Sequence, residues 1–140
     1  MIKGFVCSTF DLLHPGHLLY LKDAKLQCDY LIAGLQIDPT IDRSGKRKPI
    51  ENIRERYARL NACKYIDEII TYETEADLYV LLNRLDIDIL VMGSDWEDID
   101  NPIKYLVKEV CYHDRSIHNY SSTSLRKRIQ EEENKRDGLI

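Results

Sequence analysis

The sequence predicts an α/β fold in which helices pack on a five-stranded, mainly parallel sheet. Short apolar runs alternate with segments of helical periodicity along the chain. Strands that alternate with helices form right-handed βαβ units, and such units build a parallel sheet. A chain of 140 residues has the size of a single domain. We therefore expect one domain over residues 1–130, followed by a charged tail over residues 131–140.

Two strands and two helices are expected in the first half of the chain. The strands are IKGFVC (2–7) and DYLIAGLQID (29–38), both mainly apolar. The helix between them has apolar residues at helical spacing, namely Leu18, Leu21, Ala24 and Cys28. Residues 39–49, PTIDRSGKRKP, form a loop by composition. The helix that follows has one apolar face, made of Ile53, Tyr57, Leu60 and Cys63.

The second half of the chain continues the alternation. Strands are expected over YIDEIIT (65–71) and DIDILVMG (86–93). Between them EADLYVLLNRL (75–85) predicts a helix, whose acidic start suits the helix dipole. The remaining expected elements are a helix after Pro102, a short strand over 110–112, and a last helix after YSST (120–123) with Ser122 as its N-cap.

Composition and charge argue against several classes of protein. A net charge of −4 does not favour a general nucleic-acid binder, which normally has a strongly basic face. The four cysteines, which are widely spread and show no C-x-x-C pair, are expected to be buried reduced thiols of a cytoplasmic protein. No apolar run approaches about 18 residues, so we expect a soluble protein with no membrane partner.

Polar segments follow four of the expected strands. These segments are STFDLLHPGH (8–17), QIDPT (36–40), GSDWED (93–98) and HDRSIHNYSST (113–123). In a parallel sheet they all lie on the rim formed by the carboxyl ends of the strands, where ligands bind near the topological switch point. The rim is therefore the expected functional site.

His14 and His17 lie where the first strand gives way to a helix. Two histidines satisfied by local hydrogen bonds would be the ordinary interpretation. A helix N-terminus also attracts anions, and imidazole donors beside its free amides would stabilise charge on a phosphate. Zinc needs three or four protein ligands, and no third ligand has convincing spacing. We expect phosphate binding here, and no protein-bound metal site.

The other candidates on the rim each have a structural and a functional interpretation. The basic segment from Arg43 to Lys48 is either a solvated loop or a lid for a polyphosphate. Asp95 is either a turn residue or a partner of a sugar, base or metal. Arg115 and the hydroxyl cluster from Ser121 to Ser124 form either a capped helix start or a second phosphate site.

Five segments together resemble the small cytidylyltransferases of the HxGH nucleotidyltransferase superfamily, and most closely the bacterial glycerol-3-phosphate cytidylyltransferases. The segments are TFDLLHPGH (9–17), GKRKP (45–49), RERYARLNACKYIDEII (54–70), DILVMGSDW (88–96) and SSTSLRKRI (121–129). The resemblance implies a Rossmann-like three-layer fold and a homodimer. It implies that a phosphorylated alcohol attacks the α-phosphate of CTP, with Mg²⁺ on the triphosphate and pyrophosphate released. The product would be a CDP-linked compound for cell-envelope or capsule polymers.

The resemblance also assigns roles to individual positions. His14 and His17 would bind phosphates and stabilise the transition state, with Lys46 and Arg115 as further catalytic cations. The nucleotide would be bound by Thr9, Phe10, His14, His17, Asp95, Arg115, Ser122 and Thr123. The phosphorylated substrate would be bound by Asp38, Lys46, Lys48 and Arg56.

Three positions depart from the family pattern. Ser8 stands where the family has glycine, GSDW replaces GDDW, and the segment between Arg115 and the hydroxyls is altered and contains His118, for which the family offers no role. These departures leave open an adenylyltransferase that uses ATP and a sugar phosphate, flavin or pantetheine phosphate. A non-catalytic nucleotide-binding regulator is a third, less favoured interpretation.

Overall fold

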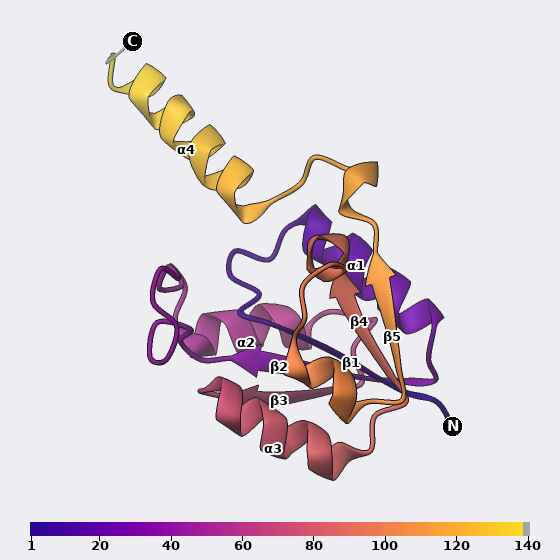
Figure 1. Ribbon diagram of the computed structural model, residues 1–140. Helices are drawn as coiled ribbons and strands as arrows, with labels where there is room; N and C mark the ends of the chain where they lie inside the picture. The colour runs from indigo at the N-terminus through magenta and orange to yellow at the C-terminus, as the bar shows by residue number, and fades with distance from the viewer. Residues whose placement is uncertain (139–140) are drawn as a thin grey trace.

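The computed structural model describes residues 1–138 and confirms the expected α/β fold (Figure 1). One sheet has the strand order β3-β2-β1-β4-β5, and its four strand pairings are all parallel. The strands are β1 (Lys3–Ser8), β2 (Tyr30–Gln36), β3 (Glu68–Tyr72), β4 (Ile89–Gly93) and β5 (Glu109–His113). The α-helices are α1 (Pro15–Leu26), α2 (Ile53–Asn61), α3 (Glu75–Leu85) and α4 (Ser122–Arg136).

Two apolar clusters, one on each face of the sheet, give the domain three layers. Because successive side chains of a strand point to opposite faces, neighbouring residues of β1 enter different clusters. Val6 packs with Leu21 of α1 and Leu60 of α2. Phe5 packs with Leu78 of α3 on the other face, and the short 3₁₀-helix η2 (Pro102–Leu106) adds Ile103 to that cluster. The central strand β1 is thus held from both sides.

The last helix begins differently from the expectation. Ser121, not Ser122, is its N-cap, because the Ser121 hydroxyl accepts a hydrogen bond from Ser124 N at 3.0 Å. Ser122 is the first helical residue, and its hydroxyl lies instead beside the His14 ring. The hydroxyl that was expected to cap the helix therefore contacts two residues of the segment before α1, His14 and Asp11.

Helix α4 extends away from the sheet, with the described end of the chain farthest from the other elements (Figure 1). The helix continues to Arg136, so much of the expected tail over 131–140 is helical, and residues 139 and 140 lie outside the described residues. The boundary at residue 130 stays a prediction. Within residues 1–138, no helix combines the length and the apolar character needed to cross a membrane.

The segments that follow β4 and β5 are short 3₁₀-helices. The helix expected after Pro102 is η2, and two further turns are η1 (Ser94–Trp96) and η3 (Arg115–Ile117). Because such turns are compact, they keep Asp95 and Arg115 close to the strand ends.

Candidate functional site

The topological switch point of the sheet lies between β1 and β4, because the chain moves from β1 to β2 on one side and returns to β4 on the other. Two adjoining hollows open there. The histidine pocket, of about 280 Å³, is lined by all four histidines and by Ser121–Thr123. The loop pocket, of about 380 Å³, is lined by residues of the basic loop (residues 43–48) and by the ends of β2 and β3. The two share Cys7, Ser8, Tyr20, Gly93, Asp95, Trp96 and Arg115.

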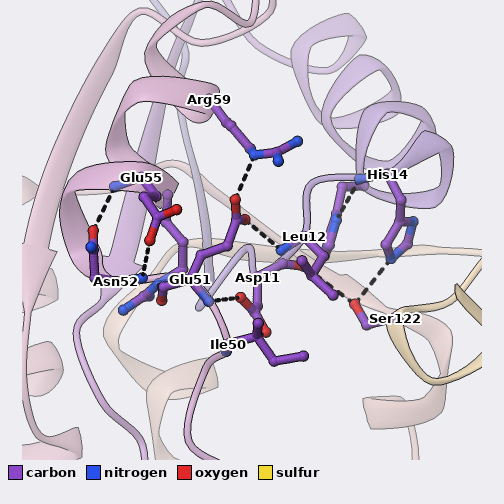
Figure 2. A network of polar contacts seen from close by, with 11 residues as sticks. Asp11, Leu12, His14, Ile50, Glu51, Asn52, Glu55, Arg59 and Ser122 are labelled. Carbon is purple, nitrogen blue, oxygen red and sulfur yellow. Dashed lines mark hydrogen bonds and ion pairs between the residues drawn. The ribbon is translucent and has the colours of Figure 1, made fainter. Parts of the chain in front are cut away.

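His14 is both a helix cap and a rim residue. Its Nδ1 accepts a hydrogen bond from Gly16 N at 3.0 Å, and its Nε2 lies 3.2 Å from the Ser122 hydroxyl (Figure 2). His17 Nδ1 accepts from His14 N at 3.2 Å, which completes a capping box. A Cβ on Gly16 would lie 2.8 Å from His14 Cε1 and 2.9 Å from Tyr120 O. Glycine is therefore needed at this position for His14 to reach its capping geometry.

These contacts fix the protonation of both rings. Because Nδ1 accepts a backbone proton in each histidine, a neutral ring carries its own proton on Nε2. Burial, His14 and Arg115 lower the pKa of His17 to about 3, and burial together with Arg115 and His118 also lowers the pKa of His14. Both histidines are thus neutral near pH 7, each with an Nε2–H donor.

The lining of the histidine pocket also contains the other two histidines, His113 and His118. His113, which is 3 % exposed, has Nδ1 3.0 Å from a carboxylate oxygen of Asp23 and Nε2 3.4 Å from His118 Nε2. His118 Nδ1 accepts from Tyr120 N at 3.3 Å, and the ring stacks between those of His113 and Tyr120. This chain of contacts ties the segment before Ser121 to α1. The sequence singled out His118 but gave it no role.

Two buried carboxylates brace the turn between β1 and α1. Asp11 accepts from Ile50 N at 2.9 Å and from Glu51 N at 3.0 Å. Glu51 accepts from Leu12 N at 2.9 Å and from Arg59 Nε at 2.7 Å (Figure 2). Left-handed backbone at a non-glycine residue costs about 1–3 kcal/mol. Because Phe10 and Leu12 have φ of 47° and 50°, the turn needs these anchors.

The side chains of two predicted site residues are almost fully buried and have structural roles. Arg56 is 2 % exposed, and it donates to the carbonyl oxygens of Thr9, Gln36, Ile37 and Glu51. Its guanidinium is occupied by the main chain and lines neither pocket, which corrects its expected contact with substrate. The Phe10 side chain is 1 % exposed and packs edge-on to His17, so it supports the histidine, and a contact of Phe10 with the nucleotide stays a prediction.

The basic loop reaches the loop pocket through some of its cations. Lys46 and Arg47 line the pocket, and Lys46 Nζ lies 5.9 Å from the centre of the Trp96 ring. Arg43 lines it as well and pairs with Glu75 at 3.6 Å. Lys48 is exposed and lines neither pocket. The Asp38 carboxylate also lies outside the linings, because it accepts from the Thr40 amide and hydroxyl, which lower its pKa.

The wall shared by the two pockets contains two of the other predicted residues, Asp95 and Arg115. Arg115 donates to Asp95 at 3.3 Å, and both side chains are about half exposed. A Cβ on Gly93 would lie 2.7 Å from Asp95 Oδ1. Glycine at this position therefore leaves room for the Asp95–Arg115 pair. Ser8, the departure from the family pattern, lines both pockets and accepts from Phe10 N at 3.3 Å. Thr9 lines the loop pocket, and Ser122 and Thr123 line the histidine pocket.

The described residues contain no group of three or more His, Cys, Asp or Glu side chains placed to hold a metal ion.

The prediction from the sequence did not include Asp11, Glu51 and His113 among the site residues, although each belongs to the segment around a candidate residue. The spacing of TFDLLHPGH could have pointed to Asp11, but nothing local predicts that its partners lie 39 and 40 residues away.

Residues 5–128 match the cytidylyltransferase-like family. The chain belongs to this family. As a cytidylyltransferase-like protein it is similar to the bifunctional protein HldE of Nitrobacter winogradskyi, at 38 % identity over 66 % of this chain and 19 % of the relative. The HldE of Campylobacter concisus is 30 % identical over 93 % of this chain and 27 % of its own length. The chain thus spans about a fifth to a quarter of these relatives.

Solved structures give the same fold. The lipopolysaccharide core biosynthesis protein of Thermoplasma volcanium has a TM-score of 0.66 at 24 % identity, over 81 % of this chain and 98 % of that one. The pantothenate synthetase of Thermus thermophilus has a TM-score of 0.54 at 15 % identity, over 81 % and 55 %. At these identities the likeness extends to the fold alone. The family is one of nucleotidyltransferases, and the site contains neutral and cationic donors suited to a polyphosphate.

Proposed function

We propose that this cytidylyltransferase-like protein transfers AMP from ATP to a sugar phosphate and releases pyrophosphate. The observation that carries the proposal is the pair of Nε2–H donors on His14 and His17, held by backbone contacts in one pocket with Ser122 and Arg115. Preorganised donors of this kind stabilise charge that develops on a phosphate in the transition state.

In the proposed reaction, a phosphate oxygen of the acceptor attacks the α-phosphorus of the triphosphate. A new P–O bond forms as the bond to the bridging oxygen of pyrophosphate breaks, and the electron pair leaves with pyrophosphate. His14 and His17 donate to the phosphate oxygens, while Lys46 and Arg115 supply positive charge from the loop pocket and the shared wall. The acceleration comes from positioning and charge stabilisation, with no covalent enzyme intermediate.

Mg²⁺ is proposed to enter with the triphosphate, as part of the substrate. This ion is usually bound through phosphate oxygens, waters and one or two carboxylates. Asp95, which lies on the wall common to both pockets, is the carboxylate that the proposal places nearest to it.

The sequence-based expectation favoured CTP and glycerol 3-phosphate, with ATP and a sugar phosphate among the alternatives. The relatives named above are HldE proteins, and this likeness favours the alternative. Because those relatives are much longer than this chain, both substrates are part of the proposal. A homodimer, also implied by the family resemblance, is proposed as well and can be tested by analytical ultracentrifugation.

The test is a screen for pyrophosphate release with ATP, CTP, UTP and GTP, each in the presence of Mg²⁺. Each triphosphate is paired with a panel of sugar phosphates, glycerol 3-phosphate, a flavin phosphate and pantetheine phosphate. The proposal expects turnover with ATP and one or more sugar phosphates. Turnover with CTP but not ATP would restore the first expectation. No turnover with any pair would leave the nucleotide-binding regulator.

A further inference from the structure

The loop pocket has a second chemical character besides its cations. It extends from the shared wall toward the ends of β2 and β3, where Gln36 and Tyr72 are both almost fully buried. Beside them lie the carboxylate of Glu75 and the guanidinium of Arg43, and apolar side chains of Leu78 and Ile103 line the same pocket. The lining thus joins hydrogen-bonding groups to an apolar surface.

Arg43 and Glu75 come from different elements and meet inside this pocket. Arg43 Nη1 lies 3.6 Å from Glu75 Oε1, and about a third or less of each side chain is exposed. The Asp42 carboxylate accepts from Glu75 N at 2.9 Å, which fastens the basic loop to the start of α3. This backbone contact keeps Glu75 next to the basic loop that carries Arg43.

The hydrogen bonding of this pair is incomplete. Arg43 Nε is buried and has no hydrogen-bond partner among residues 1–138. A buried donor without an acceptor costs free energy, and such a group calls for an explanation. The Arg43–Glu75 contact is also longer than an ideal charge-assisted hydrogen bond of about 2.7–2.9 Å. Both observations fit an ion pair whose unused hydrogen-bond donors and acceptors bind a ligand.

A carboxylate accepts from hydroxyl groups, and a guanidinium presents several donors in a planar fork. Together with the Gln36 amide they match a compound that carries several neighbouring hydroxyls. The apolar lining and Trp96 suit the C–H surface of a sugar ring, and Lys46 and Arg47 suit its phosphate. A glycerol phosphate, with only a short chain beyond its phosphate, has too few groups to satisfy them all.

We propose that Arg43 and Glu75 bind the hydroxyl groups of the acceptor, so that the loop pocket selects a polyhydroxylated sugar phosphate over a glycerol phosphate. This inference rests on the proposed nucleotidyl transfer for its place in the reaction. The histidine pocket then takes the triphosphate, and the two substrates meet at the shared wall beside Ser8 and Arg115.

The test compares Glu75→Gln with the matched variant Glu73→Gln, which removes the same charge from an exposed side chain two residues earlier. We expect Glu75→Gln to raise the KM for a sugar phosphate tenfold or more, with the KM for the triphosphate and the thermal unfolding curve unchanged. Arg43→Lys should do the same, because it keeps the charge and loses the fork. Glu73→Gln should behave as the wild type. Equal acceptor KM values in the Glu75 and Glu73 variants would overturn the inference.

A binding measurement separates this inference from the proposed function. Calorimetric titration of hexose and heptose phosphates and of glycerol 3-phosphate into each variant requires no turnover. Sugar phosphates that bind the wild type at least tenfold more tightly than they bind the Glu75→Gln variant would support the inference even if no pyrophosphate were released. Preference of the wild type for glycerol 3-phosphate would overturn it, even if nucleotidyl transfer were observed.

Discussion

The histidine pocket and the loop pocket share a wall but are built in different ways. The histidine pocket takes its key groups from two short segments, and backbone contacts hold both histidine rings. The loop pocket collects residues from the ends of four strands, the basic loop and α3, and its lysine is exposed. This contrast fits the proposed reaction, in which the preorganised histidine pocket takes the triphosphate and the more exposed loop pocket takes the acceptor.

The largest effect is expected from His17→Ala in the histidine pocket. Removal of one preorganised donor lowers turnover by about 10²–10³-fold in sites of this kind. Steady-state pyrophosphate release measures the change, and circular dichroism checks that the fold is retained. Turnover within a few fold of the wild type would show that the histidine pocket is not the catalytic side.

Arg56→Met should damage both pockets together by destabilising the fold beneath them. Loss of the guanidinium leaves four carbonyl oxygens without their donor, which we expect to lower the free energy of unfolding by about 3 kcal/mol or more. Urea unfolding measures it, with Arg54→Met on the exposed side of α2 as control. An unchanged unfolding free energy combined with a raised acceptor KM would restore the role expected from the sequence.

Lys46→Ala tests the loop side of the comparison. Because Lys46 is exposed and lines the loop pocket, its loss should raise the KM for the phosphorylated acceptor by about tenfold. The free energy of unfolding should stay the same. Lys48→Ala is the matched control, since Lys48 lines neither pocket. If Lys48→Ala weakened binding as much as Lys46→Ala, the loop would act through its summed charge and not through the placement of one ammonium group.

The smallest effect is a change in the pH dependence of stability. The pKa of His17 is about 3 in the folded protein and about 6.5 in an unfolded chain. As the pH falls below about 6.5, the unfolded chain binds a proton that the folded ring does not, so stability falls with pH. Urea unfolding at pH 7.5, 6.5 and 5.5 should show a shallower fall in His17→Asn. Identical slopes in variant and wild type would contradict the low pKa.

The fold could be predicted from the sequence because its signals are local. Helix α3 has the bounds that its acidic start and apolar spacing indicate. The strand expected over 65–71 begins at Glu68 instead, because the Asp67 carboxylate accepts from Leu31 N and Lys25 and holds the turn before the strand. Short-range patterns located the elements, and contacts between distant residues decided their ends.

The candidate site was predicted only where its residues lie in short-range sequence motifs. His14, His17, Ser122 and Thr123 lie in contiguous motifs, and the structure brings them together in one pocket. Gln36 and Glu75 were not predicted, because each resembles an ordinary strand or helix residue until the fold brings them to the same pocket. The burial of Arg56 has the same origin, since three of its four carbonyl partners lie on residues 9–37.

Arg56 has one more consequence. Its guanidinium binds Ile37 O, its Nε binds Glu51 O, and Asp11 binds the amides of Ile50 and Glu51. The loop over residues 38–49 is therefore fastened at both ends to groups that also hold the turn before His14. Since the cost of closing a loop changes slowly with its length, this loop can change in length at little cost while the turn before His14 keeps its anchors. Residues within 38–49 line the loop pocket and none of them lines the histidine pocket, so a changed loop would alter the first lining and leave the second as it is.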